Sequence, residues 1–378
     1  MTRKRPLFRF AVATACTALS ALTTAAQRPP AAIAAAARPA QATQRWEVVR
    51  YNRVLQRRHF DIDSAQLVAL GRQEYQRLES EMIALAKQID PTKDWSEIVR
   101  QFERANHPRT VRDIVPAYQR ELQRAKAFVL GHDLVSLPAA GDLAVRETPP
   151  NLVAITPYAR YRWDDDVLLV TLNIGDANGE GEALQSNNDG LIATGAVHEA
   201  YPGHRVQHLI RPGGETNEDT ETFSEGWGLY SEELMLRLGY YDDRSRETRL
   251  YALRMLLWRA ARALLDAQVN RGDIPAEAAI RFLVDKVGLS ETRARLEVTS
   301  RYVGVPGSAA TYLVGKRQIE QLRRQLRARE GERFSLKQFH DRLLAQDMAP
   351  LQTIARKAFQ MELEPAGILQ VDAGAQRW

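Results

Sequence analysis

The sequence predicts a mainly α-helical protein with a small β element. Apolar residues recur at helical spacing from about residue 46 to residue 135, and again from residue 187 onward. Only the stretch DVLLVTLNIGD, residues 166–176, has the composition of a strand, and it lies among segments that contain Pro and Gly. The chain has 378 residues and is 44% hydrophobic, which is enough to bury a large core.

The first 26 residues predict an exported protein. They combine a basic start (MTRKRPLFRF), an apolar run (AVATACTALSAL) and small residues before a cleavage point (TTAAQ). The apolar run is shorter than the ~18 residues that span a bilayer, so we expect a cleaved signal peptide and no stable membrane insertion afterwards. The mature protein would be periplasmic or secreted. Lipid attachment at Cys16 is disfavoured, because ATAC lies too early in the apolar run and lacks the usual large aliphatic residue.

Loss of the signal peptide, residues 1–26, changes the charge and the cysteine content. The whole chain carries 52 basic and 47 acidic side chains, and the signal peptide removes four basic ones and no acidic one, so that 48 and 47 remain. A nearly neutral chain is not expected to bind nucleic acid. Cys16 is the only cysteine, so the mature chain has no disulfide, thiol nucleophile or thiolate ligand. A bound metal would need His, Asp and Glu ligands.

The rest of the chain is expected to form one domain. Residues 27–45 are an Ala/Pro-rich linker without periodicity, and residues 46–378 form a single helical domain. An Asp-Ser pair before the apolar pattern of residues 65–89 is a helix start signal. The basic run of residues 316–330 has apolar residues at helical spacing. Its charges are therefore expected to form a solvated outer face and not a nucleic-acid surface.

The segment AVHEAYPGHRVQHL, residues 196–209, holds three of the seven histidines. Zinc hydrolases often place two histidines at positions i and i+4 of one helix, with a glutamate after the first that acts on water. His198 and Glu199 supply the first half of that motif, but the i+4 position is Pro202, which cannot bind metal. The next histidine, His204, is at i+6 and would point ~240° round an ideal helix.

The Pro202-Gly203 pair offers a way to correct this spacing. A proline inside a helix removes one hydrogen bond, and glycine tolerates the unusual dihedral angles that follow. A bulge of about two residues in the helix would bring His204 to the side of His198. His204 and His208 are themselves i and i+4, but Arg205 stands where that pair would need its glutamate.

A third ligand is expected from the same region, residues 187–240. Glu225 lies 27 residues after His198, in FSEGWGLYSEEL, among aromatic residues that indicate a half-buried helix. Gly226 and Gly228 beside it would let another backbone come close. The alternative is that Glu225 caps a helix or forms a local ion pair, and residue chemistry leaves both open.

Five blocks in order carry a resemblance to a known family: HEAYPGHRVQ, SEGWGLYSEEL, RAARALLDAQV, RYVGVPGSAATYLVGK and FHDRLLAQDMAPL. They resemble the bacterial family catalogued as domain of unknown function 885. That family is similar to the helical gluzincin metallopeptidases of the carboxypeptidase Taq and angiotensin-converting-enzyme types. The resemblance covers roughly residues 60–378, and it implies a zincin-like helical fold with a Pro-Gly bulge in the active-site helix, the HExxPGH motif.

The resemblance also implies roles for individual residues. One zinc ion would be held by His198, His204 and Glu225, and Glu199 would be the general base that accepts a proton from a metal-activated water. Tyr312 resembles a tyrosine that donates a hydrogen bond to the oxyanion, although it is equally an ordinary packed aromatic residue.

Weaker candidates concern the substrate, which we expect to be a peptide. Arg301 and Lys316 are candidates to bind a substrate carboxylate, although surface ion pairs are the alternative. A block that usually reads D-T-G-L-H ends here in Asn270, so a histidine near the cleft is replaced. The predicted strand is expected to pair with an extended peptide.

The leading interpretation is an exported zinc metallopeptidase. Two alternatives remain open: a catalytically weak or inactive protein that binds peptides in a zincin-like cleft, and a metal-dependent amidase that acts on cell-wall peptides. Glu199 favours an enzyme, because a binding protein has no need of a base beside the metal.

Overall fold

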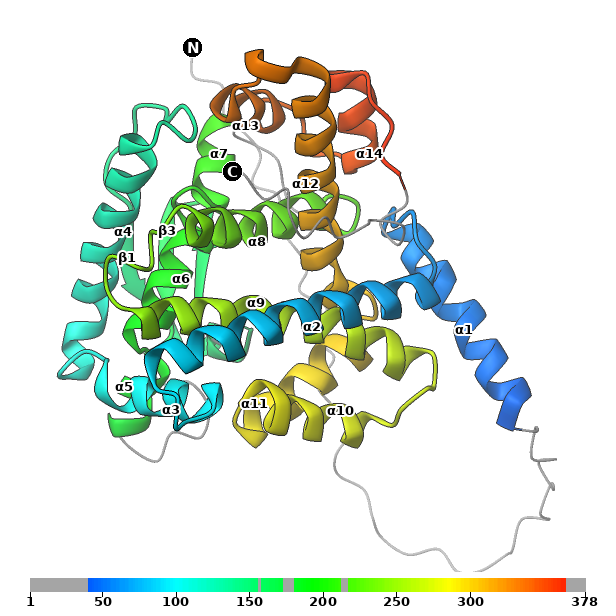
Figure 1. The fold of residues 1–378 in the computed structure, drawn as a ribbon, viewed down its shortest axis with the longest axis horizontal. Coiled ribbons are helices and arrows are strands. Elements are labelled where there is room, and N and C mark those ends of the chain that lie inside the picture. The colour runs from blue at the N-terminus through cyan, green and yellow to red at the C-terminus, as the bar shows by residue number, and fades with distance from the viewer. Residues whose placement is uncertain (1–39, 156–157, 173–179, 212–216, 365–378) are drawn as a thin grey trace, which may run out of the picture. The chain divides into compact units, whose positions relative to one another are not determined.

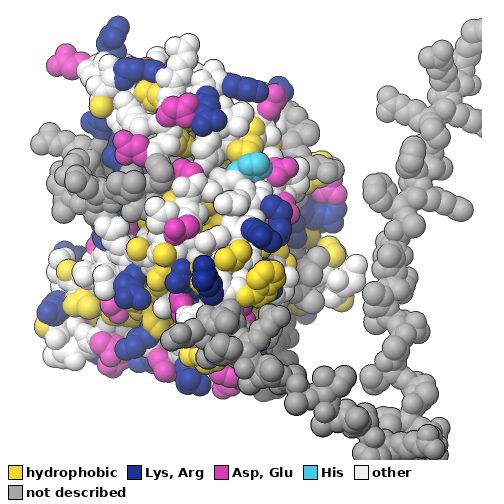
Figure 2. Space-filling view, turned by 90° about the vertical axis from the view of Figure 1, so that its right-hand side faces the viewer, with side chains coloured by type: hydrophobic (Ala, Val, Ile, Leu, Met, Phe, Trp, Pro, Cys, Tyr) yellow, Lys and Arg dark blue, Asp and Glu magenta, His cyan; other side chains and the backbone are white. Residues whose placement is uncertain are grey.

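The structure is a computed structural model that describes residues 40–155, 158–172, 180–211 and 217–364. The predicted signal peptide, with Cys16, lies outside these residues. Within the described part, no helix is both long enough and apolar enough to cross a bilayer. On the face drawn in Figure 2, basic and acidic side chains are interspersed, and neither sign forms a continuous tract.

The described chain is mainly helical with one small sheet, as the sequence predicts (Figure 1). The helices before the sheet are α1 (Ala40–Arg57), α2 (Ser64–Ile89), α3 (Trp95–Ala105) and α4 (Ile114–Gly131). The Asp-Ser start signal is confirmed, because the Asp63 side chain accepts a hydrogen bond from the backbone N–H of Gln66 at 2.8 Å. Helix α1 begins at Ala40, so it includes the end of the segment that the sequence assigned to the linker, residues 27–45.

The sheet has three strands, where the sequence predicts one. The strands are β1 (Ala144–Glu147), β2 (Ala159–Arg162) and β3 (Val167–Val170), in the order β1-β3-β2. The predicted strand is β3, and all four of its residues are buried. It pairs in parallel with β1 and antiparallel with β2. The expectation that this strand itself pairs with a peptide is therefore wrong, because both of its edges are occupied. The two outer strands of the sheet are β1 and β2.

The remaining helices surround the sheet and the core. They are α5 (Glu180–Ser186), α6 (Asp189–Glu199), α7 (His204–Ile210), α8 (Glu221–Arg237), α9 (Arg246–Asn270), α10 (Ala276–Phe282), α11 (Glu291–Leu296), α12 (Thr311–Glu330), α13 (Leu336–Leu344) and α14 (Leu351–Ile354). Helices α2 and α9 lie side by side (Figure 1). They approach closely at Gly71, where a Cβ would lie 2.7 Å from the backbone nitrogen of Leu264.

Helices α8 and α12 cross with their backbones in contact (Figure 1). A Cβ on Gly226 would lie 2.5 Å from the Cα of Gly315, and a Cβ on Gly315 would lie 1.9 Å from the carbonyl oxygen of Thr222. The expectation that Gly226 admits another backbone is confirmed. This contact matters for the site, because α8 carries Glu225 and α12 carries Tyr312.

The expectation of a solvated charged face on α12 is wrong for the first part of the helix, where the charged side chains are buried; Arg327 and Arg329 in the last turn are exposed. Lys316 is 2% exposed, and its ammonium group forms ion pairs with Glu74 at 2.9 Å, with Glu320 at 3.2 Å and with Glu233. Partners on α2 and α8 neutralise the charge inside the protein, which a charged side chain needs in order to be buried. A single sequence shows the basic residues of α12 but not their distant acidic partners.

The close crossing of α8 and α12 predicts that replacing Gly315 destabilises the protein more than replacing another helical glycine. Gly315→Ala should lower the free energy of unfolding by about 1–3 kcal/mol, because the new methyl group meets backbone atoms that cannot move away. Gly131→Ala is the matched control, since a Cβ at Gly131 meets nothing within 4 Å. Chemical denaturation of both variants measures the difference. Equal stability of the two would contradict the close crossing.

Candidate metal centre

The segment that holds the three histidines forms two helices, not one bulged helix. Helix α6 begins at an Asn188 cap, whose side chain accepts a hydrogen bond from the N–H of Leu191 at 3.0 Å, and it ends at Glu199. Helix α7 begins at His204. The four residues between them, 200–203, contain a cis peptide bond between Tyr201 and Pro202.

Wide hydrogen bonds join the two helices. The N–H of Tyr201 donates to the carbonyl of Ala196 at 3.1 Å, and that of Gly203 donates to the carbonyl of Val197 at 3.1 Å. These bonds span five and six residues where a regular helix spans four. The backbone thus takes up the two additional residues without separating the helices. The result is the one the spacing argument requires, because the rings of His198 and His204 have their centroids 4.7 Å apart.

Helix α8 supplies the carboxylate between these two rings. The Oε2 atom of Glu225 lies 3.3 Å from Nε2 of His198 and 3.6 Å from Nε2 of His204. Gly228, one turn further along α8, makes room for the first ring, since a Cβ there would lie 2.5 Å from Cε1 of His198. The missing side chain at Gly228 therefore makes room for the imidazole of His198. The expectation that it makes room for the backbone of another segment is wrong.

The segment that interrupts the helix, residues 200–203, is also hydrogen-bonded to α8. The indole N–H of Trp227 donates to the carbonyl of Pro202 at 2.9 Å, and Trp227 is fully buried. Ser224, one turn earlier, lies 3.5 Å through its hydroxyl from Nδ1 of His204. One helix thus provides a carboxylate for both imidazoles and holds the segment that positions the second of them.

A second buried carboxylate orients the first histidine. Oε1 of Glu232 lies 2.8 Å from Nδ1 of His198, and Glu232 is 2% exposed. This contact leaves Nε2 of His198 directed at Glu225. A carboxylate on the far nitrogen of an imidazole is the usual outer support of a histidine that binds metal. Arg259 of α9 lies 3.6 Å from the same carboxylate oxygen.

The charges of the site reflect these contacts. Burial lowers the pKa of His198, but hydrogen bonds to Glu225 and Glu232 outweigh burial and raise it to about 10. Burial raises the pKa of Glu225, but the two histidines outweigh it and hold the pKa well below its usual range. The metal-free site therefore keeps a proton on His198, and a metal ion that took the place of this proton would meet an ionised carboxylate.

Glu199 is the other carboxylate close to both histidines. His198, Glu199 and His204 each place one ligand atom within 4.8 Å of the others. The Oε2 atom of Glu199 accepts a hydrogen bond from the backbone N–H of Tyr161 on β2 at 2.8 Å. Glu199 and Glu225 are thus both within reach of a metal ion, but Glu225 lies between the two imidazoles and Glu199 is fixed by the sheet.

Tyr312 lies beside the histidines, as the resemblance implies. Its ring stacks on that of His198 at 6.1 Å between centroids and an angle of 22°. Burial and the charge of Glu225 raise the pKa of Tyr312 to about 12, so its hydroxyl keeps its proton at neutral pH. The guanidinium of Arg301 lies 5.9 Å from the centre of the Tyr312 ring, and its side chain is 34% exposed.

The other two weak candidates lie elsewhere. Lys316 is buried in the ion pairs described above, so its ammonium group is not offered to a ligand. Asn270 is also buried, and its amide group donates to the carbonyls of Asp266 and Tyr302, both at 2.9 Å. Asn270 thus joins α9 to the segment that carries Arg301.

Three supporting residues are not identified from the sequence: Glu232, Trp227 and Tyr161. Glu232 had a detectable signal, because it follows Glu225 by seven residues and so lies on the same face of a helix. Trp227 and Tyr161 act through contacts with residues far away in the chain, and no local pattern marks such contacts.

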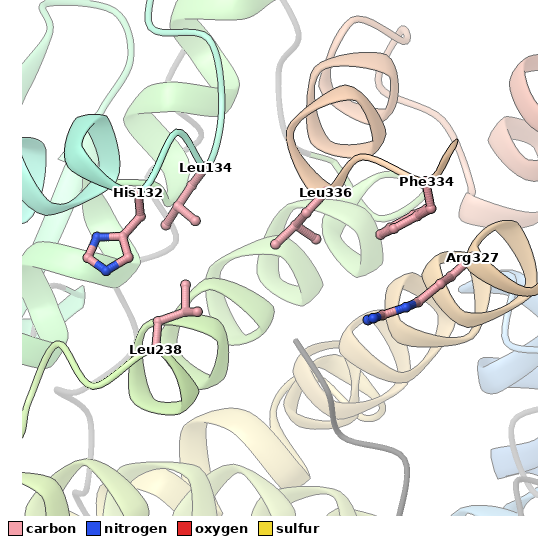
Figure 3. A pocket seen from close by; sticks show the side chains of 6 residues that line it. All are labelled: His132, Leu134, Leu238, Arg327, Phe334 and Leu336. Carbon is pink, nitrogen blue, oxygen red and sulfur yellow. The ribbon is translucent and has the colours of Figure 1, made fainter. Parts of the chain in front are cut away.

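A separate cavity lies away from this site (Figure 3). It has a volume of about 270 Å³ and is lined by His132, Leu134, Leu238, Arg327, Phe334 and Leu336. Leu238, the residue directly after α8, follows Glu225 by 13 residues, a distance of about 20 Å at the rise of an α-helix. The cavity therefore takes no part in the metal centre.

The contact between Glu232 and His198 predicts that Glu232 affects metal binding without being a ligand. Glu232→Gln should weaken zinc binding about 10–100-fold, because the neutral amide no longer supports the imidazole of His198. Competition with a chelating dye measures the affinity, and Glu291→Gln, at an exposed position, is the control. An unchanged affinity in Glu232→Gln would exclude the supporting role.

With the fold and the site described, the chain can be compared with known proteins. Two solved structures share the fold. A "putative lipoprotein" from Colwellia psychrerythraea has a TM-score of 0.71 at 22% identity, and the match covers 82% of this chain and 55% of that one. A "putative lipoprotein of unknown function" from Shewanella oneidensis has a TM-score of 0.69 at 20% identity, with 82% and 59% covered. The chain thus spans little more than half the length of these proteins.

Among curated proteins, no sequence matches the chain. A family model does match it, over residues 5–357, and its description is "Bacterial protein of unknown function (DUF885)". This match includes nearly the whole chain and both helices of the HExxPGH segment. The chain belongs to the DUF885 family.

Proposed function

We propose that the protein is an exported, zinc-dependent metallopeptidase that hydrolyses peptide bonds, with its catalytic domain in residues 46–378. The observation that carries the proposal is the position of one Glu225 oxygen 3.3 Å and 3.6 Å from the Nε2 atoms of His198 and His204. On an uninterrupted helix, His204 would point away from His198. The interruption between α6 and α7 brings the two imidazoles together beside Glu225.

The donor set fits a zinc ion. Two imidazole nitrogens and one carboxylate are a usual set of protein ligands in catalytic zinc sites, which keep a further position open. We assign His198, His204 and Glu225 as the ligands, because Glu225 lies between both imidazoles. When bound, zinc would supply Lewis-acid polarisation of the substrate carbonyl and would lower the pKa of a water molecule.

Glu199 is the general base of this proposal. It is adjacent in sequence to the ligand His198, and the N–H of Tyr161 holds one of its carboxylate oxygens. Its other oxygen makes no hydrogen bond to the described residues. That oxygen takes the proton of the attacking water and delivers it to the leaving amine.

Tyr312 and Arg301 complete the reaction site. The Tyr312 hydroxyl stays protonated near neutral pH and donates a hydrogen bond to the oxygen on which negative charge develops. Arg301 lies beside Tyr312 and is partly exposed, and it binds an anionic group of the substrate.

The outer edge of β2 binds the peptide backbone. The N–H of Thr171 donates to the carbonyl of Tyr158 at 2.7 Å, and because peptide groups alternate along an antiparallel pair, those of Ala159 and Tyr161 face away from β3. The N–H of Tyr161 donates to Glu199, so this edge borders the residue that we propose as the base. An extended peptide that paired with β2 would pass next to Glu199.

Export follows from the first 26 residues, which have the three parts of a signal peptide. The description of two proteins of the same fold as lipoproteins supports an extracytoplasmic place for this fold. We propose that the mature protein is periplasmic or secreted and acts on peptides.

Removal of the base separates an enzyme from a binding protein. Glu199→Gln should retain about one zinc ion per chain and lose at least about 100-fold in peptide hydrolysis, because the amide cannot accept a proton. Zinc is measured by elemental analysis, and hydrolysis by mass spectrometry of a peptide mixture. A wild-type protein that holds zinc but cuts no peptide would leave the peptide-binding alternative or the cell-wall amidase. Undiminished hydrolysis in Glu199→Gln would exclude Glu199 as the base.

A further inference from the structure

An exposed tryptophan stands next to the candidate site. Trp163 follows β2 directly, in the turn that leads to β3, and it is 42% exposed. Few large apolar side chains in the described part of the chain are as exposed. Exposed aromatic rings beside a site are frequent anchors for ligands, because they offer a large rigid surface.

A histidine links this tryptophan to the metal centre. The ring of His208 lies 6.3 Å from that of Trp163 and 6.0 Å from that of Tyr161, measured between centroids. His208 follows His204 by four residues on α7, so the two side chains lie on the same face, one turn apart. Helix α7 thus directs one imidazole to the metal centre and the next to the aromatic rings.

Strand β2 sets the distance between Glu199 and Trp163. Tyr161 contacts Glu199 through its N–H, and Trp163 is two residues further along the chain, in the turn that follows β2. Two residues of chain span at most about 7 Å. This is also the spacing of successive side chains on one face of a paired peptide. A substrate on the β2 edge would therefore present side chains toward Trp163 within one or two residues of the base.

The charges around Trp163 do not favour an anionic ligand. Three carboxylates follow it in the chain, and each has a cationic partner: Arg162 forms ion pairs with Asp164 and Asp165, and Arg205 forms one with Asp166. What remains for a ligand is the ring of Trp163 and the side of His208.

We propose that Trp163 and His208 form an aromatic subsite that receives a large apolar or aromatic side chain of the peptide substrate. This inference rests on the proposed function, and it gives that function a substrate preference. The subsite lies on the β2 side of the base, and it acts by contact with the substrate and not on the reacting bond.

Binding tests the subsite without relying on cleavage. The probes are fluorescein-labelled heptapeptides of alanine and glycine in which a single phenylalanine occupies each position in turn, with the all-alanine/glycine peptide as reference. Fluorescence anisotropy measures their affinity for the zinc-loaded Glu199→Gln protein. At one or two positions, phenylalanine should strengthen binding about tenfold. Adding Trp163→Ala should remove this advantage.

Controls keep the test specific. Trp46→Ala removes another tryptophan, 56% exposed on α1, and should leave the preference unchanged. His208→Ala should reduce the preference independently of Trp163. Phenylalanine binding without position dependence, or a preference that survives Trp163→Ala, would overturn the subsite.

The test also separates the subsite from the proposed activity. Binding of phenylalanine that depends on Trp163, together with a wild-type protein that cuts no peptide, would support the subsite and reject the peptidase. Cleavage of peptides without a preference for phenylalanine that depends on Trp163 would support the peptidase and reject the subsite. An N-acetylglucosamine trimer is the remaining probe, and binding of this sugar through Trp163 without any preference for phenylalanine would assign the rings to a glycan and overturn the proposal.

Discussion

The candidate metal centre depends on the interruption of a helix at residues 200–203. An uninterrupted helix would direct His198 and His204 to nearly opposite sides, because six residues correspond to ~240°. The wide hydrogen bonds from Tyr201 and Gly203 take up the two additional residues and keep α6 and α7 in contact. A side chain at Gly203 would collide with the carbonyl of His198, with its Cβ 1.8 Å from that oxygen. The interruption is thus tightly packed and leaves little freedom to the second imidazole.

Helix α8 holds this arrangement together. Glu225, Gly228 and Glu232 are three and seven residues apart, so they form one face of the helix, and all three contact or accommodate His198. Trp227 holds the interruption through Pro202. An adjacent side of α8 packs on α12 through glycine and joins the buried ion pairs of Lys316 through Glu233, which is fully buried. The position of the site is therefore set by contacts between elements distant in sequence.

The sequence predicts much of this fold and some of its site. Helices with strong periodicity, such as α2 and α9, lie where their apolar patterns and the Asp63 cap predict. The residues around the interruption also come together as the spacing argument requires. Strands β1 and β2 are not predicted, because each has only four residues, and so short an alternation as Ala-Arg-Tyr-Arg in β2 does not stand out from the surrounding loops. Buried charges are the other failure: Lys316 resembles a surface residue until its partners on other helices are known.

The central claim is that the interruption turns His204 into a partner of His198 while the neighbouring histidine stays outside the metal centre. Metal content after reconstitution with zinc tests it most directly, by elemental analysis of the wild type, His204→Ala and His208→Ala. The account predicts about one zinc ion per chain in the wild type and in His208→Ala, and loss of that ion in His204→Ala. Zinc that persists in His204→Ala but disappears in His208→Ala, or a wild type that takes up none, would contradict it.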